Sequence, residues 1–194
     1  MTTTINRVGY RHSKDDILDG AVATAFADGL SQLSFGNVAR RLGISDRVVV
    51  YYFPSKDDLI GEVLVALGEQ LQAALAPAFA KPAADHVEVL RVAWPVLARS
   101  EVDPVFALFF EASGLAATGR EPYRTLVAEL MQGWTVWVQS LLGGTLAQRR
   151  AEAAAAMATI DGLLLMRQVV GPDAADVAAR RIVRTRRGTR GSSQ

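Results

Sequence analysis

Apolar residues recur at three- and four-residue spacing along almost the whole chain, and no stretch alternates long enough to make a strand. This periodicity favours helices and predicts an all-α fold. At 194 residues, half of them hydrophobic, the chain is long enough to bury a core but short for two ordinary domains. We therefore expect a small N-terminal three-helix module and a larger C-terminal helical bundle.

Capping residues and helix breakers divide the chain. Ser13, Ser34 and Ser45 are suited to cap helices, and Gly43 is suited to end one. The expected helices cover approximately residues 14–28, 35–42, 46–52, 56–77, 85–100, 104–118, 121–142, 145–170 and 173–186.

The second and third expected helices have the spacing of a helix-turn-helix, since only the tight turn Leu42-Gly43-Ile44-Ser45 separates them. In such a motif the second helix enters the DNA major groove. Arg47 can donate to a guanine edge and Val48 can touch a thymine methyl. The spacing alone fits equally well a three-helix packing unit whose serines only cap. The candidate DNA-contacting residues are Ser34, Ser45, Asp46, Arg47, Val48, Tyr51, Tyr52 and Lys56.

Two motifs carry a family resemblance: VARRLGIS at 38–45 and YYFPSKDDL at 51–59. With the apolar helix before them, they make residues 17–59 resemble the DNA-binding domain of the TetR (tetracycline repressor) family. The resemblance covers about the first third of the chain. It departs from the family pattern at Val50, where a tyrosine is usual, and at Arg47, where a small residue is common. It implies a homodimeric repressor of palindromic double-stranded DNA operators.

Aromatic residues are concentrated on the expected helices between residues 85 and 142. They can line an apolar pocket or fill a solid core, and the resemblance implies an effector cavity. The candidate pocket residues are Trp94, Phe106, Phe110, Met131 and Trp134. Glu111 and Asp161 interrupt apolar runs, and we expect both to face solvent. The implied partner is a hydrophobic small-molecule effector.

Small residues form a stripe on the eighth expected helix, along which another helix can approach closely: Ala154, Ala158, Gly162 and Leu165. The resemblance implies a four-helix dimer interface here. Packing within one chain is the alternative.

Charge is distributed unevenly although the net charge is only +1. By our count the net charges are +2 over residues 1–56, −7 over 57–179 and +6 over 180–194. Basic ends can follow phosphates. We expect a DNA-binding domain over 1–56, a ligand-binding and dimerisation domain over 57–186, and a basic flexible tail over 187–194. Arg7, Tyr10, Arg11 and Lys14 form either a DNA-contacting arm or a frayed terminus.

Catalysis is disfavoured by the residue inventory. Cysteine is absent, and the two histidines, His12 and His86, are far apart in sequence. No nucleophile elbow, phosphate-binding glycine loop or metal-ligand cluster is present in the sequence, so we expect no enzyme, cofactor or metal. The sequence has no apolar signal segment or convincing membrane span, and we expect a cytoplasmic protein.

The sequence therefore predicts a DNA-binding transcriptional regulator, most simply a ligand-responsive repressor. The alternative is a helix-turn-helix protein with a solid core, constitutive or controlled by a protein partner.

Overall fold

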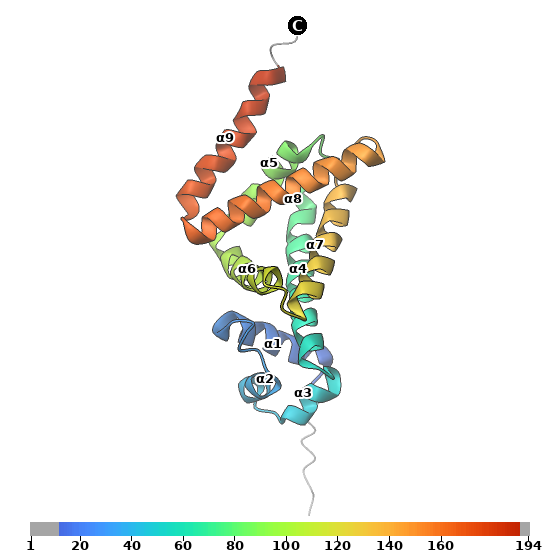
Figure 1. The fold of residues 1–194 in the computed structure, drawn as a ribbon, viewed down its shortest axis with the longest axis vertical. Helices are drawn as coiled ribbons and strands as arrows, with labels where there is room; N and C mark the ends of the chain where they lie inside the picture. The colour runs from blue at the N-terminus through green and yellow to red at the C-terminus, as the bar shows by residue number, and fades with distance from the viewer. Residues whose placement is uncertain (1–11, 191–194) are drawn as a thin grey trace, which may run out of the picture. The chain divides into compact units, whose positions relative to one another are not determined.

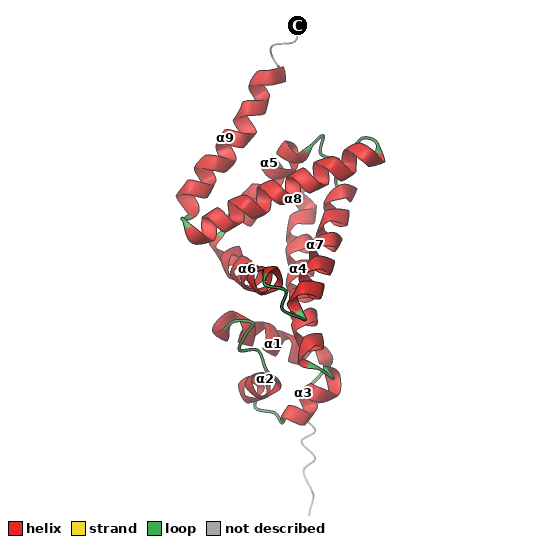
Figure 2. Ribbon diagram, viewed as in Figure 1, coloured by secondary structure: helices red, strands yellow, loops and turns green. Residues whose placement is uncertain are grey.

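The computed structural model describes residues 12–190 and is helical throughout (Figures 1 and 2). The α-helices of this part are α1 (Lys14–Asp28), α2 (Phe35–Leu42), α3 (Asp46–Tyr52), α4 (Lys56–Leu75), α5 (His86–Leu97), α6 (Asp103–Ala117), α7 (Tyr123–Ser140), α8 (Leu146–Val169) and α9 (Pro172–Arg190). Two short 3₁₀ helices, Ala76–Ala78 and Ser100–Val102, follow α4 and precede α6. The all-α prediction is confirmed.

The chain divides into two compact units, one up to Val63 and one from Leu64 onward. Helices α1 to α3 and the first two turns of α4 form the first unit. The rest of α4 and helices α5 to α9 form the second. Helix α4 therefore belongs to both units and is continuous through the boundary.

Local hydrogen bonds fix the helix ends of the first unit. Ser13 and Asp16 form a capping box at α1, in which Asp16 N donates to Ser13 Oγ (3.1 Å) and Ser13 N donates to Asp16 Oδ2 (2.7 Å). The backbone N–H and the hydroxyl of Ser13 hold the pKa of Asp16 below its ordinary value. Gly43 ends α2 in the left-handed conformation at φ 66°, which a residue without a Cβ adopts readily.

Close packing of α1 on α2 depends on Gly20. A Cβ built at Gly20 would lie 2.7 Å from both Cδ atoms of Leu42, so only glycine fits there without a shift. Buried side chains from all four helices and from the loops between them complete the core of this unit: Ile17, Ala21, Ala25, Leu30, Leu33, Val38, Ala39, Val49, Phe53, Leu59, Ile60 and Val63.

In the second unit, helix α8 packs against α5, α6, α7 and α9. Its buried residues recur at helical spacing and share one core with α4 to α7: Ala153, Ala156, Ile160, Leu163 and Leu164. Next to this face the guanidinium of Arg167 is bonded twice to the carboxylate of Asp103, which ties α8 to the start of α6.

Helix ends differ from the expected ones mainly near the C-terminus. The last helix continues to Arg190, whereas the sequence pattern ended it at 186. Residues 191–194 of the expected basic tail lie outside the described part of the chain. So do Arg7, Tyr10 and Arg11 of the expected N-terminal arm.

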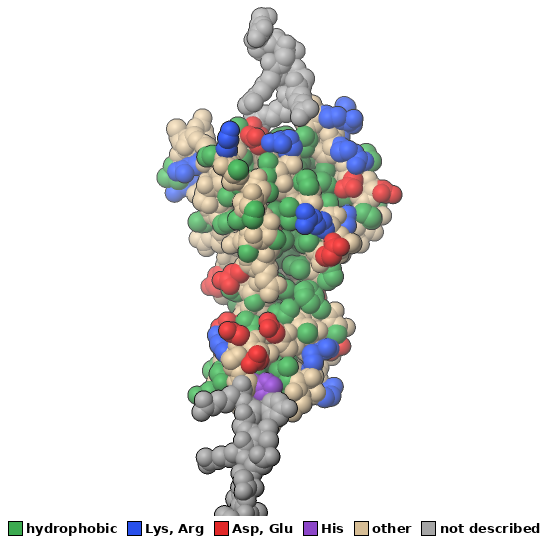
Figure 3. Space-filling model, turned by 180° about the vertical axis from the view of Figure 1, so that it is seen from behind, with side chains coloured by type: hydrophobic (Ala, Val, Ile, Leu, Met, Phe, Trp, Pro, Cys, Tyr) green, Lys and Arg blue, Asp and Glu red, His purple; other side chains and the backbone are tan. Residues whose placement is uncertain are grey.

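One helical stretch of the described chain, Lys56–Ala78, is long and apolar enough to pass as a membrane span by length and composition. Core helices of soluble proteins pass the same test. Here Leu59, Ile60, Val63, Leu67 and Leu71 are buried within the protein. On the face drawn in Figure 3, charged side chains of both signs are scattered among hydrophobic ones.

Candidate DNA-binding surface and ligand cavity

Helix α3 is anchored by one buried residue and leaves much of its surface free. Val49 is inaccessible, and Val48 is half-buried. Asp46 and Arg47 are exposed on the first turn of the helix. This arrangement presents an acid and a guanidinium outward, as the helix-turn-helix interpretation expects.

The two tyrosines of α3 are not equivalent. Tyr52 is partly buried, and its hydroxyl donates to the backbone carbonyl of His12 at 3.0 Å. Tyr51 is 78% exposed and meets the Tyr52 ring edge-on, with the centroids 4.9 Å apart. Tyr52 therefore ties α3 to the residue that precedes α1, and Tyr51 is the more accessible of the two aromatic side chains. Val50, where the sequence departs from the family pattern, is 41% exposed beside it.

Polar groups at the helix N-termini behave differently from one another. Ser34 Oγ accepts from Asn37 N at 3.3 Å, so this serine caps α2. Ser45 occupies the N-cap position of α3 but accepts no side-chain capping bond, contrary to its expected role as a cap. Lys56, in the first turn of α4, is exposed and donates to the Ser31 carbonyl at 3.4 Å.

Lys14 is committed within the first unit. Its Nζ lies 2.6 Å from Glu62 Oε1 and 5.5 Å from the centroid of the Phe53 ring. These contacts tie α1 to α4 and account for this lysine without a DNA arm.

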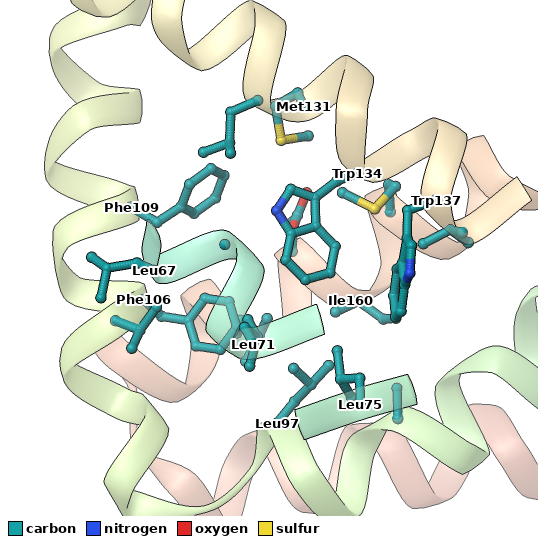
Figure 4. A pocket seen from close by; sticks show the side chains of 18 of the residues that line it. Leu67, Leu71, Leu75, Leu97, Phe106, Phe109, Met131, Trp134, Trp137 and Ile160 are labelled. Carbon is teal, nitrogen blue, oxygen red and sulfur yellow. The ribbon is translucent and has the colours of Figure 1, made fainter. Parts of the chain in front are cut away.

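The second unit contains a cavity of about 80 Å³ bounded by helices α4 to α8 (Figure 4). Side chains from different helices point into this space, among them Leu71 of α4, Phe106 of α6 and Trp134 of α7. The full lining comprises Leu64, Leu67, Gly68, Leu71, Leu75, Phe79, Val89, Ala93, Leu97, Val105, Phe106, Phe109, Leu130, Met131, Trp134, Trp137, Val138, Met157, Ile160, Asp161 and Leu164.

Three of the five expected pocket residues, Phe106, Met131 and Trp134, line this cavity together. The other two do not, and the expectation for them is corrected. Trp94 packs toward α9, where its Nε1 donates to Asp176 Oδ1 at 2.8 Å. Phe110 lies outside the lining; the preceding residue, Phe109, lines it instead, with the two ring centroids 5.3 Å apart.

Sequence reasoning missed the contribution of α4. Its residues Leu64, Leu67, Gly68, Leu71 and Leu75 follow a three- and four-residue spacing that a helical projection would have placed on one face. A Cβ at Gly68 would lie 3.4 Å from Trp134 Nε1, so the glycine lets the indole approach the helix.

The cavity lining also includes two aromatic rings that the sequence did not predict for the pocket, Trp137 and Phe79. Trp137 meets Trp134 edge-on at 5.3 Å and Phe79 edge-on at 6.3 Å. Such edge-to-face pairs hold the rings in fixed orientations.

Asp161 lines the cavity, which corrects the expectation that it faces solvent. Burial raises the pKa of Asp161 to about 6, since a carboxylate is poorly solvated among apolar side chains. The sequence contained a signal for this position, because the three- and four-residue spacing places Asp161 on one helical face with Met157, Ile160 and Leu164. Glu111, by contrast, is half-buried on α6 and is not among the lining residues.

The small-residue stripe of α8 lies on the surface of the protomer. Ala154, Ala158, Gly162 and Leu165 are all exposed, and a Cβ at Gly162 would meet no atom within 4 Å. Large apolar side chains are also exposed on α8 and on the following helix α9: Leu165, Met166, Val169 and Val177. In the part of the chain that the structure describes, no group of three or more histidine and acidic side chains is placed to hold a metal ion.

Comparison with known proteins places the first unit in a described family. Residues 17–63 match the model of the bacterial regulatory proteins of the tetR family. No curated protein sequence matches the chain.

Solved structures are similar over nearly the whole chain. A transcriptional regulator from Rhodococcus sp. Rha1 is 21% identical, with a TM-score of 0.69 over 90% of this chain and 95% of that one. A TetR transcriptional regulator from Legionella pneumophila is 19% identical, with a TM-score of 0.64 over 92% and 98%. The multidrug binding protein EbrR in complex with malachite green is 26% identical, with a TM-score of 0.66 over 90% and 98%.

A helix-turn-helix unit with an exposed second helix, joined to a helical body of this fold, defines a DNA-binding transcriptional regulator. The family match itself covers residues 17–63, the DNA-binding unit of the tetR family of bacterial regulatory proteins, and the rest of the chain shares the fold of solved TetR-family regulators.

Proposed function

We propose that the protein is a ligand-responsive repressor that binds palindromic operators as a homodimer. The observation that carries the proposal is the course of α4, which begins at Lys56 directly after the helix-turn-helix and lines the cavity from Leu64 to Leu75. One continuous helix thus shares residues with both proposed sites.

Base recognition is assigned to the exposed surface of α3. Arg47 is suited to a bidentate contact with guanine, and Val48 to a thymine methyl. Tyr51 is suited to a phosphate or a base, and we give it the role that the sequence had divided between Tyr51 and Tyr52. Asp46, next to Arg47, would restrict which base the arginine reads.

Phosphate contacts are assigned to helix N-termini. Ser45 has a hydroxyl that no capping bond uses, and Ser34 and Lys56 lie at the starts of α2 and α4. Backbone N–H groups and the positive end of the helix dipole favour an anion at such positions. These contacts fix the register on the duplex without reading sequence.

Dimerisation is assigned to α8 and α9. The exposed stripe of Ala154, Ala158, Gly162 and Leu165 allows close approach of a second helix, and the exposed Val169 and Val177 add apolar area. A dimer is also what operator recognition requires, because two recognition helices one DNA turn apart read a palindrome.

Ligand binding is assigned to the cavity. Its lining is almost entirely apolar, as effector sites commonly are, and a structural neighbour is described as a multidrug binding protein complexed with imidazole, proflavin or malachite green. The cavity favours a small-molecule effector over a solid core controlled by a protein partner. A ligand that binds better to one orientation of α4 would shift the population away from the DNA-binding state.

The test combines selection and competition. Duplexes are selected from genomic fragments with the purified protein, and the affinity for the best duplex is then measured with and without apolar small molecules. The proposal expects a palindromic consensus and a ligand that weakens DNA binding. Affinity that no ligand changes would favour the constitutive alternative.

A further inference from the structure

The cavity is apolar except for a single ionisable group. Twenty of its described lining residues are aliphatic, aromatic, methionine or glycine, and Asp161 alone carries a charge. Helices α4 to α7 contribute no other ionisable side chain to the lining. A ligand in this space therefore meets one acid surrounded by apolar surface.

Asp161 is not committed to the fold. Among the described residues it forms no hydrogen bond or ion pair, and it is partly buried on α8 between Ile160 and Leu163. Two half-buried acids elsewhere in this unit have a basic partner: Asp103 pairs with Arg167, and Glu152 with His86. An unpaired carboxylate in such surroundings lowers stability, since burial without a counter-charge is costly.

The aromatic rings of the lining, like the carboxylate of Asp161, are chemically suited to a positively charged ligand. Trp134, Trp137, Phe79, Phe106 and Phe109 surround one space with the carboxylate. Ring faces attract cations, and cages of aromatic side chains recognise quaternary ammonium ions.

We propose that the effector is a hydrophobic monocation, an amine or quaternary ammonium carrying an aromatic or alkyl group, with Asp161 as its counter-charge. This rests on the ligand-binding role assigned to the cavity above. The single carboxylate matches one positive charge, and the apolar lining matches the organic part. An anion would meet Asp161 with like charge, and a neutral ligand would leave it unpaired.

The size of the site restricts the organic part. At about 80 Å³ the cavity is smaller than an engineered cavity of roughly 150 Å³ that accommodates benzene. A ligand of one ring therefore needs some movement of the lining. Met131 and Met157 are suited to it, because their unbranched side chains adapt at low cost.

The experiment compares two probes of nearly the same shape: benzyltrimethylammonium and its carbon isostere neopentylbenzene. The quaternary nitrogen cannot lose a proton, so any pH dependence comes from the protein. Binding is followed by calorimetry and by tryptophan fluorescence, since Trp134 and Trp137 line the cavity. The variants are Asp161→Asn, which removes the charge at nearly constant shape, and Glu129→Gln, which makes the same change at an exposed position next to Leu130 of the lining.

We expect Asp161→Asn to weaken binding of the cation by roughly tenfold or more and to leave the neutral isostere unchanged or bound more tightly. Glu129→Gln should resemble the parent protein. In the parent, affinity for the cation should fall as pH is lowered from 7.5 to 5, and this dependence should disappear in Asp161→Asn. Should the cation fail to bind the parent protein, or should Asp161→Asn affect both probes equally, the proposal is overturned.

Coupling to DNA is read separately. If the cation binds in an Asp161-dependent way but leaves duplex affinity unchanged, the ligand class stands and the repressor mechanism fails. If only neutral compounds bind and they release DNA, the repressor mechanism stands and the ligand class fails.

Discussion

Arg167 and Asp103 form a two-point ion pair between α8 and the first turn of α6. The Nε of Arg167 donates to Asp103 Oδ1 at 2.6 Å, and one terminal nitrogen donates to Oδ2 at 3.0 Å. The Arg167 side chain is 6% exposed, whereas the Asp103 side chain is 34% exposed. The partly solvated carboxylate of Asp103 is therefore the counter-charge of the buried Arg167 guanidinium.

Removing the carboxylate should leave that guanidinium buried without its counter-charge. We expect Asp103→Asn to lower the free energy of unfolding by about 2–3 kcal/mol, since partial exposure of Asp103 makes the loss smaller than for a wholly buried pair. Chemical denaturation measures it. Glu101→Gln, at an exposed acid two residues earlier, is the control and should change stability little. Equal stabilities of the two variants would contradict this role.

Asp161 should make stability depend on pH in a direction opposite to that of most acids. Because its pKa is raised to about 6 in the folded state, the folded protein holds a proton that the unfolded chain has lost. The free energy of unfolding is therefore unaffected by this residue's titration below the unfolded pKa near 4, and it falls as pH rises from 4 toward 6. Over this pH range the titration of Asp161 lowers the free energy of unfolding by on the order of 2–3 kcal/mol in total.

Thermal melts of the parent protein and Asp161→Asn at pH 4, 5, 6 and 7.5 isolate this effect from other titrating groups. The variant should gain stability relative to the parent as pH rises to 6, with no further gain above about pH 7. A constant difference across the series would show that Asp161 keeps its ordinary pKa.

A larger residue at Gly20 should weaken the contact of α1 with α2. In Gly20→Ala the new methyl would lie 2.7 Å from the Leu42 Cδ atoms, and forcing Leu42 aside should cost about 1–3 kcal/mol. Gly114→Ala is the matched change, because a Cβ there meets nothing within 4 Å. It should stabilise α6 by roughly 0.5–1 kcal/mol through helix propensity. The same sign of effect in both variants would refute the steric account.

The α8 stripe should control the oligomeric state. Ala158→Glu places a charge on an exposed surface of the protomer, so we expect the protomer fold to survive while the dimer dissociates. Sedimentation equilibrium measures the mass, and circular dichroism checks the fold. Ala128→Glu, on the exposed side of α7, should remain dimeric. A dimer that persists in Ala158→Glu would place the interface elsewhere.

Much of the fold could be predicted because its boundaries depend on local chemistry. Ser13, Ser34 and Gly43 specify helix ends through bonds to residues three or four positions away, and these ends were correct. The resemblance then specified the helix-turn-helix. Ser45 was the exception, since its position at the start of α3 was correct but its capping bond was not.

The composition of the cavity was harder to predict, since it depends on how helices distant in sequence rotate against one another. Phe109 and Phe110 are adjacent and chemically alike, and only packing decides which one lines the cavity. Trp94 lies away from it because Asp176, far along the chain, accepts its indole N–H. The expectation that Asp161 faces solvent was wrong, because this charged residue lies on the same apolar helical face as Ile160 and Leu164.

DNA recognition by α3 is the central claim, and fluorescence anisotropy of a selected duplex over a series of KCl concentrations tests it most directly. The affinity of the parent protein should fall steeply with salt. Lys56→Ala should weaken binding to all duplexes and reduce the salt slope by about one, and Arg47→Ala should relax base preference by about 1–3 kcal/mol. Lys81→Ala, at an exposed lysine of the second unit, should do neither. A protein with no salt-sensitive affinity for any duplex, or an Arg47→Ala variant that selects the same sequences as its parent, would contradict the account.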